Sequence, residues 1–408
     1  MITMHPHTLK DCYASIENGI LIVGNDKIER RFDVKNLAFL ETTDRVGGKI
    51  YAGAVPLLVP ALDVNAAVCC ASAKTDHNNG ASEEFLAASL QYTADNTTLT
   101  IRFDVFPSLP FVTTTMTLDS EGGSFIVEKE IGGQPPLSDF DRSRMLDGIV
   151  FGRKHTKMTR YTFYDASDYR SQPVRSQTVH LYHRGKHDEW GNMFHITDTV
   201  NGDELLLVKN SPVCQSHLSY DAADLRIEGM TFMLCGAGFD YSELPAGTVP
   251  FYSATIGVGK DLLREHRALH RALNRGIGTL FCMENTWGDR SCDKKLCDAF
   301  IRSEIDAAAH VGVDYVQIDD GWAKGTVDTK EGFLQHIWEG YYDADPDYWK
   351  VSTKKFPEGF GSLTAYAKEK GVELGLWFSP DSSNEMRHWK EDAETLLNFY
   401  HNYNFRGF

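Results

Sequence analysis

The sequence lacks an apolar run long enough to cross a membrane as a helix, and its first twenty residues have neither the basic start nor the apolar core of a secretory signal. Basic residues are also scarce, because 41 lysines and arginines stand against 57 aspartates and glutamates and leave a formal charge of -16. Such a charge repels phosphate backbones and anionic lipids. We therefore expect a soluble, cytoplasmic protein that binds neither nucleic acid nor membranes.

Paired cysteine motifs are absent as well. The eight cysteines are scattered without a CxxC pair through 408 residues, a length that can bury a core without disulfide bonds. We expect reduced thiols. His266 and His270 lie one helical turn apart, but without a third ligand nearby the pair indicates surface residues of a helix and not a metal site. The sequence suggests no metal and no cofactor.

The first half of the chain is rich in short runs of alternating apolar and polar residues. These runs extend from about residue 15 to 257 and are broken by Gly, Asn, Asp and Pro. One example is "NGILIVGNDKIERRFDV", in which Asn25 and Asp26 form a candidate turn. Alternation of this kind predicts strands, and the frequent turns favour two packed antiparallel sheets. We expect a β-sandwich domain over residues 1–257.

The pattern changes after residue 257. Leucines in "KDLLREHRALHRALN" (260–274) recur at helical spacing, which predicts a linker helix within 258–276. Beyond it, strand-like runs alternate with helical ones, with Ser291 as a candidate N-cap and Gly371 as a candidate helix end. The expected strands are 279–285, 313–319 and 372–378, and the expected helices are 291–310, 361–370 and 385–402. This alternation is typical of parallel βα units, so residues 277–408 are predicted to begin a (β/α)8 TIM barrel.

Two adjacent carboxylates follow the second of these strands, in "VDYVQIDDGW" (313–322). Side chains alternate across a strand, so Val316 and Ile318 share one face while Asp319 lies on the other. In a barrel the second face looks at the axis, which places Asp319 at the carboxyl-terminal rim where active sites lie, with Asp320 opening the next loop. The same alternation brings Trp377 to this rim. A carboxylate beside an aromatic ring suits a sugar, whose hydroxyls need acceptors and whose C–H face needs apolar contact.

An acidic pair after a strand can also simply cap a helix or hold a loop. The segment that follows favours a functional interpretation, because residues 321–358 form a connection far longer than usual. It carries six aromatic residues, which are Phe333, Trp338, Tyr341, Tyr342, Tyr348 and Trp349.

Three motifs of the second half resemble glycoside hydrolase family 36, the melibiase-like α-galactosidases. They are "ENTWGD" (284–289), "YVQIDDGW" (315–322) and "DYWKVSTKKFPEGFGSLTAYAKEKGVELGLWFSPD" (347–381). The resemblance implies an amino-terminal β-supersandwich, a TIM barrel and a retaining α-glycosidase acting on terminal α-galactosides of oligosaccharides. It implies that Asp319 and Asp320 accept hydrogen bonds from O4 and O6 of galactose, while Trp287 and Trp349 form walls of the −1 pocket.

The sequence departs from that family at two places. Gly288 stands where the family commonly has an acidic residue, and Ser379-Pro380-Asp381 stands where it commonly has "EPE". Both departures concern the preferred sugar more than the type of reaction.

The catalytic carboxyl pair of such an enzyme is not identified in this sequence. A retaining glycosidase needs two carboxyl groups about 5–5.5 Å apart, and neighbours on a strand such as Asp319 and Asp320 point to opposite sides. The resemblance places the nucleophile in a Lys-x-Asp motif on the fourth barrel strand, and the acid/base later. Residues 277–408 are about 130 residues, whereas a full barrel takes roughly 250. We expect an incomplete barrel, with strands 1–3 and the start of strand 4, and an inactive fragment without catalytic residues.

Two alternatives stay open at this point. One is a non-catalytic carbohydrate-binding protein that uses the same acidic pair. The other is a different barrel enzyme such as a metal-dependent hydrolase, against which the lack of a His/Asp ligand cluster at the strand ends argues. An oligomer of the intact protein is compatible with the sequence.

Overall fold

The computed structural model describes residues 2–57, 68–94, 96–122, 145–153, 155–163, 174–181, 185–211, 223–235, 246–275, 281–288, 292–325, 340–381, 383 and 386–408. The chain divides into two compact units, Met1–Ile277 and Gly278–Phe408, and each is described by itself. No helix in these ranges is sufficiently long and apolar to pass through a membrane. Ser291, Phe333 and Trp338 lie outside the described residues.

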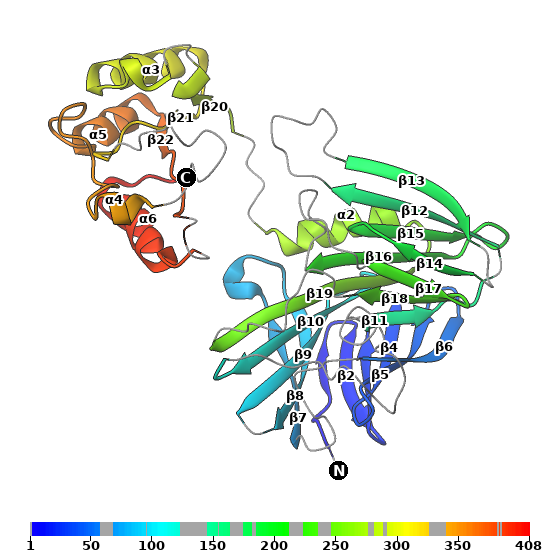
Figure 1. Ribbon diagram of the computed structural model, residues 1–408. Coiled ribbons are helices and arrows are strands. Elements are labelled where there is room, and N and C mark those ends of the chain that lie inside the picture. Colours follow the sequence, from blue (N-terminus) through cyan, green and yellow to red (C-terminus); the bar gives the residue numbers. More distant parts are fainter. Residues whose placement is uncertain are drawn as a thin grey trace. The chain divides into compact units, whose positions relative to one another are not determined.

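The first unit consists mainly of antiparallel sheets (Figure 1). A six-stranded sheet runs in the order β1 (His7–Leu9), β2 (Cys12–Glu17), β3 (Ile20–Gly24), β4 (Ile28–Asp33), β5 (Ala38–Asp44) and β6 (Lys49–Pro56). A nine-stranded sheet runs in the order β13 (Val174–Leu181), β12 (Thr156–Phe163), β15 (Met193–Asp198), β16 (Glu204–Ser211), β19 (Gly247–Gly259), β10 (Phe111–Ser120), β9 (Thr97–Val105), β8 (Phe85–Ala94) and β7 (Val68–Asp76). A four-stranded sheet contains β11 (Met145–Val150), β18 (Thr231–Cys235), β17 (Leu225–Glu228) and β14 (Lys186–Glu189).

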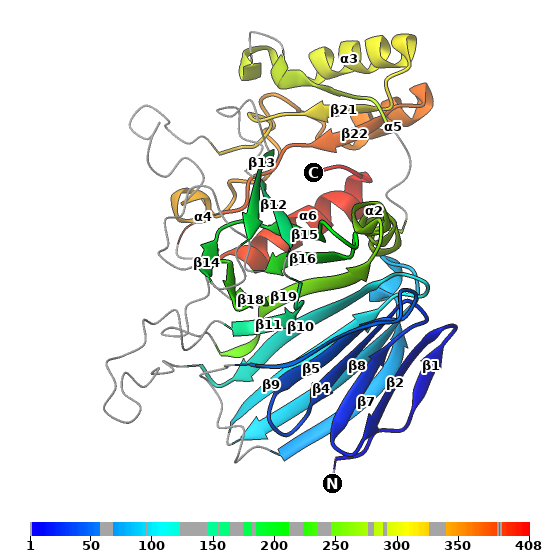
Figure 2. The same ribbon diagram turned by 90° about the vertical axis from the view of Figure 1, so that its right-hand side faces the viewer.

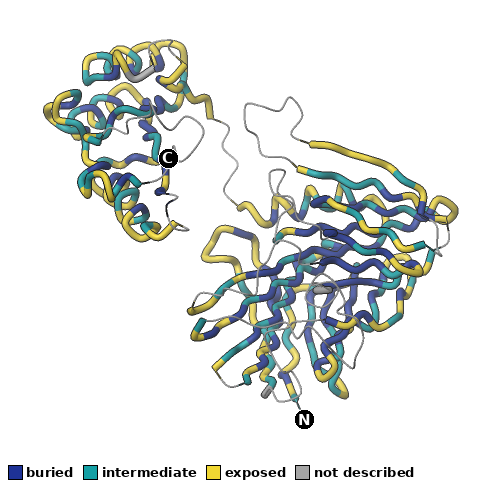
Figure 3. Tube along the Cα trace, in the orientation of Figure 1, coloured by how far each residue is buried: buried dark blue, intermediate teal, exposed yellow. Residues whose placement is uncertain are grey.

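The two larger sheets pack face to face over one hydrophobic core (Figure 2). The core follows from the alternation in the sequence, and Figure 3 shows buried and exposed residues taking turns along the strands. On β9, for example, Leu99, Ile101 and Phe103 are fully buried. The ring of Phe103 lies 5.5 Å from that of Phe32 on the other sheet. The predicted β-rich first half, with packed antiparallel sheets, is confirmed.

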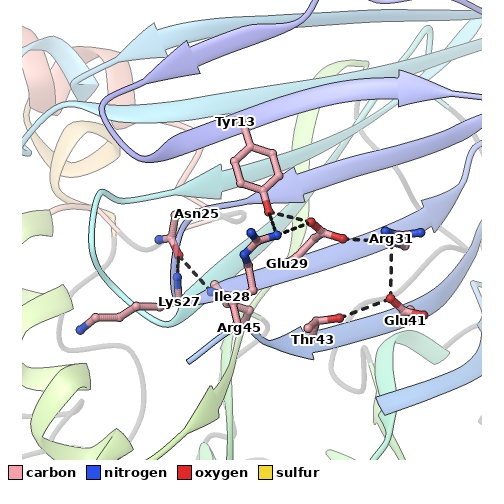
Figure 4. A network of polar contacts seen from close by, with 9 residues as sticks. All are labelled: Tyr13, Asn25, Lys27, Ile28, Glu29, Arg31, Glu41, Thr43 and Arg45. Carbon is pink, nitrogen blue, oxygen red and sulfur yellow. Dashed lines mark hydrogen bonds and ion pairs between the residues drawn. The ribbon is translucent and has the colours of Figure 1, made fainter. Parts of the chain in front are cut away.

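The predicted turn at Asn25 and Asp26 joins β3 to β4. The buried side chain of Asn25 accepts hydrogen bonds from the backbone N–H groups of Lys27 (2.8 Å) and Ile28 (3.0 Å), as Figure 4 shows. Its amide also donates to the carbonyl oxygens of Phe106 and Leu109. One side chain therefore closes the turn and fastens it to the loop after β9.

Strand β4 has a different polar arrangement on each of its faces. On the outer face, Glu29 accepts hydrogen bonds from Tyr13 (2.7 Å), Arg31 (3.0 Å) and Arg45 (3.0 Å) (Figure 4). Burial raises the pKa of Glu29, but hydrogen bonds from Tyr13 and Arg31 outweigh it, so this pKa is lowered. The inner face carries a second arginine, Arg30, at a position that the alternation assigns to the core.

The side chain of Arg30 is fully buried and forms a two-pronged ion pair with the equally buried Asp147 of β11. The two hydrogen bonds measure 2.8 and 3.1 Å. Arg30 also donates to the carbonyl oxygen of Gly148 and lies 4.0 Å from the centroid of the Phe39 ring. This ion pair links the six-stranded sheet to the four-stranded one, since β4 and β11 belong to different sheets.

Helix α2 (Leu262–Leu273) closes the first unit. Its buried face includes Leu262 and Leu269, which join Phe111 and Leu206 of the nine-stranded sheet in a separate apolar cluster. The rings of His266 and His270 lie 4.6 Å apart. Burial, followed by the neighbouring His270, lowers the pKa of His266 to about 4. In the described ranges no three His, Cys, Asp or Glu side chains are grouped so that they could hold a metal ion.

The second unit contains a three-stranded parallel sheet in the order β20 (Met283–Asn285), β21 (Tyr315–Ile318) and β22 (Glu373–Leu376). The other elements among the described residues of this unit are α3 (Asp298–Val311), α4 (Tyr341–Ala344), α5 (Gly361–Lys370), α6 (Trp389–Tyr403) and two 3-10 turns, η2 (Thr286–Gly288) and η3 (Cys292–Lys295). Val316 and Ile318 share a buried core with Ile301 of α3 and Leu363 of α5. A further parallel bridge joins Gly375 to Gly407, beside β22. Strands and helices alternate as predicted, while the assignment of this unit to the first part of a (β/α)8 barrel stays a prediction.

Helix boundaries in this unit match the sequence prediction only in part. Helix α5 ends where predicted, because Gly371 adopts the left-handed conformation (φ 75°) that a glycine tolerates at a helix end. The predicted start of a helix at 291 is wrong, because α3 begins at Asp298 after the turn η3 and the extended residue Cys297. The intervening Leu296 is buried in the core, which requires the chain to turn before the helix starts.

Candidate functional site

The carboxyl ends of the three parallel strands bring polar and aromatic side chains to one edge of the sheet. Asn285 of β20 pairs in register with Gln317 of β21, which pairs with Gly375 of β22. By alternation these three residues share a face with Asp319 and Trp377. A Cβ atom at position 375 would collide with the amide of Gln317, so glycine lets the Gln317 side chain cross over β22.

Asp319 is held at this edge by contacts to three neighbours. Its carboxylate accepts one hydrogen bond from the side-chain amide of Asn285 (2.7 Å) and another from the backbone N–H of Asp320 (2.8 Å). Its own backbone N–H donates to the hydroxyl of Thr286 (3.0 Å). Only 8% of Asp319 is exposed. Each carboxylate oxygen keeps a second lone pair that could accept a hydrogen bond from a ligand.

Asp320 is held by a backbone contact of its own. Its carboxylate accepts a hydrogen bond from the backbone N–H of Gly321 (2.6 Å). Burial, and then the negative charges of Asp320 and two other aspartates, raise the pKa of Tyr341 to about 12, although a hydrogen bond with Ser379 opposes them. Asp320 therefore lies close to the segment that carries Tyr341.

The predicted tryptophans gather at the same end of the sheet. Trp377 follows β22, and its backbone N–H donates to the carbonyl oxygen of Ile318 (2.8 Å). Trp349 is 5% exposed, and its ring lies 6.2 Å from that of Trp377 and 4.3 Å from that of Phe378. The indole N–H of Trp349 has no hydrogen-bond partner among the described residues. Trp287, after β20, is exposed. All five predicted site residues thus lie at or beside the carboxyl ends of the strands.

Two aspartates that were not predicted as site residues, Asp381 and Asp392, hold the segment around Tyr341 and Tyr342 in place. Asp381 is fully buried and accepts hydrogen bonds from the backbone N–H groups of Gly340 (3.0 Å) and Ser383 (2.9 Å). Its own N–H donates to Asp392 of α6, which also accepts a hydrogen bond from the hydroxyl of Tyr342. Burial raises the pKa of Asp381, but the hydrogen bonds outweigh it, so this pKa is lowered. The sequence did carry a signal for Asp381, because this residue ends Ser379-Pro380-Asp381, which stands where the family commonly has "EPE".

A cavity of about 550 Å³ in this unit has no part in the site. Its lining includes Gly371, Val372 and Arg406, which lie at the amino end of β22 or beside it. Ligands of parallel α/β sheets bind beyond the carboxyl ends of the strands. The cavity therefore lies at the opposite end of the sheet from Asp319.

Glu284 gives this unit a dependence on pH. It occupies the outer face of β20, where burial, and then the hydrogen bond and charge of Glu304 on α3, raise its pKa to about 7 from a usual 4.5. A carboxyl group with a raised pKa stabilises the fold fully below pH 4.5, and this stability is lost as pH rises through 7.

Glu284→Gln should therefore stabilise the second unit at pH 8 and have little effect at pH 5. The pair is partly exposed, so solvent screening limits the difference to about 1 kcal/mol. Urea unfolding at both pH values measures it. Glu369→Gln, at an exposed position of α5, is the matched control. Equal effects of Glu284→Gln at pH 5 and pH 8 would contradict the prediction.

The curated proteins that this chain resembles are α-galactosidases. No family model matches the sequence. The α-galactosidase Mel36A of Lactobacillus acidophilus is 31% identical over 118 residues, which are 28% of this chain and 13% of that protein. The galactosidase domain of the α-galactosidase-sucrose kinase AgaSK superposes with a TM-score of 0.54 at 13% identity, over 91% of this chain and 58% of that one.

A third relative carries a ligand. A variant of the family 36 α-galactosidase AgaA from Geobacillus stearothermophilus, in complex with raffinose, has a TM-score of 0.51 at 13% identity, over 95% of this chain and 58% of that one. This chain thus spans less than two thirds of the proteins it matches. The resemblance to glycoside hydrolase family 36 is confirmed, and the structural likeness shows a shared fold.

Proposed function

We propose that this chain supplies the galactose-binding carboxylates of a retaining α-glycosidase of the α-galactosidase type, which hydrolyses terminal α-galactosides of oligosaccharides. In this proposal the second unit is the first part of a (β/α)8 barrel. The matched relatives are α-galactosidases, and raffinose, bound by one of them, is an oligosaccharide. We also propose that the protein is cytoplasmic, and an oligomer of the intact protein is compatible with this function.

The observation that carries the proposal is the carboxylate of Asp319. It is nearly buried, fixed by two donors and still able to accept from a ligand. Hydroxyl groups of a sugar need such acceptors, and the neighbouring tryptophan rings offer surfaces for its C–H face. In the proposal Asp319 and Asp320 accept from O4 and O6 of galactose, and Trp287, Trp349 and Trp377 surround the ring.

The groups that break the glycosidic bond are distinct from the carboxylates that bind the sugar. A retaining mechanism needs a nucleophile and an acid/base that flank the glycosidic bond. In this proposal Asp319 and Asp320 bind hydroxyl groups and do not form such a pair, since neighbours on an extended strand point to opposite sides. We infer that the catalytic carboxyl groups are not among these 408 residues. The lack of an identified catalytic pair supports, as a second candidate, a carbohydrate-binding protein without catalysis.

Two measurements on the 408-residue chain test the proposal. Ligand-observed NMR should detect binding of methyl α-D-galactopyranoside but not of its C4 epimer, methyl α-D-glucopyranoside, because a fixed acceptor discriminates between hydroxyl directions. No p-nitrophenyl α-galactoside should be hydrolysed. Absence of galactoside binding would refute the sugar site, and turnover would refute the assignment of the catalytic groups. Activity of a longer form of the protein would separate the enzyme from the carbohydrate-binding candidate.

A further inference from the structure

Asn285 connects two parts of the site that the sequence separates. Its Nδ2 atom donates to Oδ2 of Asp319 (2.7 Å), and its Oδ1 atom accepts from the backbone N–H of Trp287 (2.8 Å). The orientation of the amide is unambiguous, because a backbone N–H can only donate and must meet the oxygen end. The amino end is thereby directed to the carboxylate, which can only accept when it is ionised.

The hydrogen bond from Asn285 restricts the rotation of the Asp319 carboxylate, which the backbone N–H of Asp320 alone would not prevent. The N–H of Asp320 holds Oδ1, but a carboxylate held at one oxygen can still rotate. Asn285 occupies the other oxygen from the neighbouring strand. The plane of the carboxylate is then fixed, and with it the directions of the two lone pairs that remain for a ligand.

We propose that Asn285 is a positioning residue that sets the direction of the Asp319 acceptor, and thereby the choice between an axial and an equatorial hydroxyl group at C4 of the bound hexose. The inference rests on the proposed function. Asn285 itself need not touch the sugar. By holding the backbone of Trp287 as well, it keeps an aromatic ring and an acceptor on neighbouring strands in one arrangement.

Substitution by aspartate gives the sharpest test, because it changes the charge and keeps the shape. Asn285→Asp would place a second carboxylate against Asp319, and two such groups close together share one proton when the pH is low enough. The protonated form restores the donor that the amide supplied. The titratable groups nearby in the described part of the unit include Asp319 and Asp320 after β21, with Glu284 on the opposite face of β20 toward Glu304. On the side of Asp320 they include Lys355, whose Nζ donates to the carbonyl oxygen of Gly321 (2.7 Å), and Tyr341 and Asp381.

The experiment measures binding of methyl α-D-galactopyranoside and methyl α-D-glucopyranoside to the 408-residue chain by ligand-observed NMR. Asn285→Ala should weaken galactoside binding about tenfold and reduce the preference over the glucoside, since it removes one hydrogen bond to a charged group. At pH 7.5, Asn285→Asp should bind the galactoside as weakly as Asn285→Ala does. At pH 5 its affinity should approach that of the wild type measured at the same pH. Asn402→Ala, which removes an exposed amide from α6, is the control and should change neither.

The outcomes separate the two proposals. If the wild type binds neither sugar, the proposed function fails and this inference fails with it. If the wild type binds the galactoside, and Asn285→Ala keeps both the wild-type affinity for it and the wild-type preference over the glucoside, only the positioning role is overturned. It is also overturned if Asn285→Asp, with an unchanged melting temperature, stays equally weak at both pH values.

Discussion

Asp319→Ala should reduce the affinity of the chain for methyl α-D-galactopyranoside about 100-fold or more. The substitution removes the two side-chain oxygens of this residue that can accept from a sugar hydroxyl, and it leaves the amide of Asn285 and the N–H of Asp320 without their acceptor. Hydrogen bonds to a charged group are worth about 1.5–3 kcal/mol each, and about 1.4 kcal/mol is a factor of ten. Titration by ligand-observed NMR or calorimetry measures the change.

The control for Asp319→Ala should lose a carboxylate elsewhere in the same unit. Asp306→Ala meets this need, since Asp306 is exposed on α3 and accepts from Tyr366 while it pairs with Lys370. We expect it to bind the galactoside like the wild type. Normal binding by Asp319→Ala would remove Asp319 from the site and with it the central step of the proposed function.

Much of the second unit could be predicted from local patterns. The two-residue alternation in "YVQID" assigns Val316 and Ile318 to the core and Asp319 to the other face, which needs no knowledge of the rest of the chain. The end of α5 could also be predicted locally, from the glycine at position 371. The start of α3 could not be predicted in this way, because it depends on where Leu296 enters the core.

The contacts that fix the site could not be predicted in this way. Asn285 reaches Asp319 because β20 and β21 lie side by side with Asn285 opposite Gln317, and no spacing within the sequence reports that register. The same is true of Asp381, whose partners Gly340 and Asp392 lie on different segments. Local patterns thus pointed to the acidic pair and Trp377, and the family resemblance added Trp287 and Trp349, while the residues that hold them depend on tertiary packing.

The buried arginine of the first unit illustrates the same limit. The alternation in "IERRFD" places Arg30 between Ile28 and Phe32 on the inner face of β4, where a charge is costly without a partner. Its partner, Asp147, is 117 residues away in the sequence. Only the packing of β11 against the six-stranded sheet brings the two together.

Asp147→Ala should destabilise the first unit by about 3–5 kcal/mol, because it leaves the guanidinium group of Arg30 buried and unpaired. Urea unfolding followed by far-UV circular dichroism, which is dominated by the strands of this unit, measures the loss. Arg31→Ala is the matched control on the same strand. Arg31 is 45% exposed and pairs with Glu29 on the outer face, so its loss should cost less than about 1 kcal/mol.

A double substitution separates the cost of an unpaired charge from the value of the pair. Arg30→Met together with Asp147→Leu removes both charges and keeps most of the buried volume. Buried ion pairs gain little over apolar groups of similar size, since desolvation offsets their attraction. The double variant should therefore recover most of the roughly 3–5 kcal/mol expected for Asp147→Ala. A double variant as unstable as Asp147→Ala would show that the pair itself, with its hydrogen bonds to Gly148 and its contact with Phe39, holds the two sheets together.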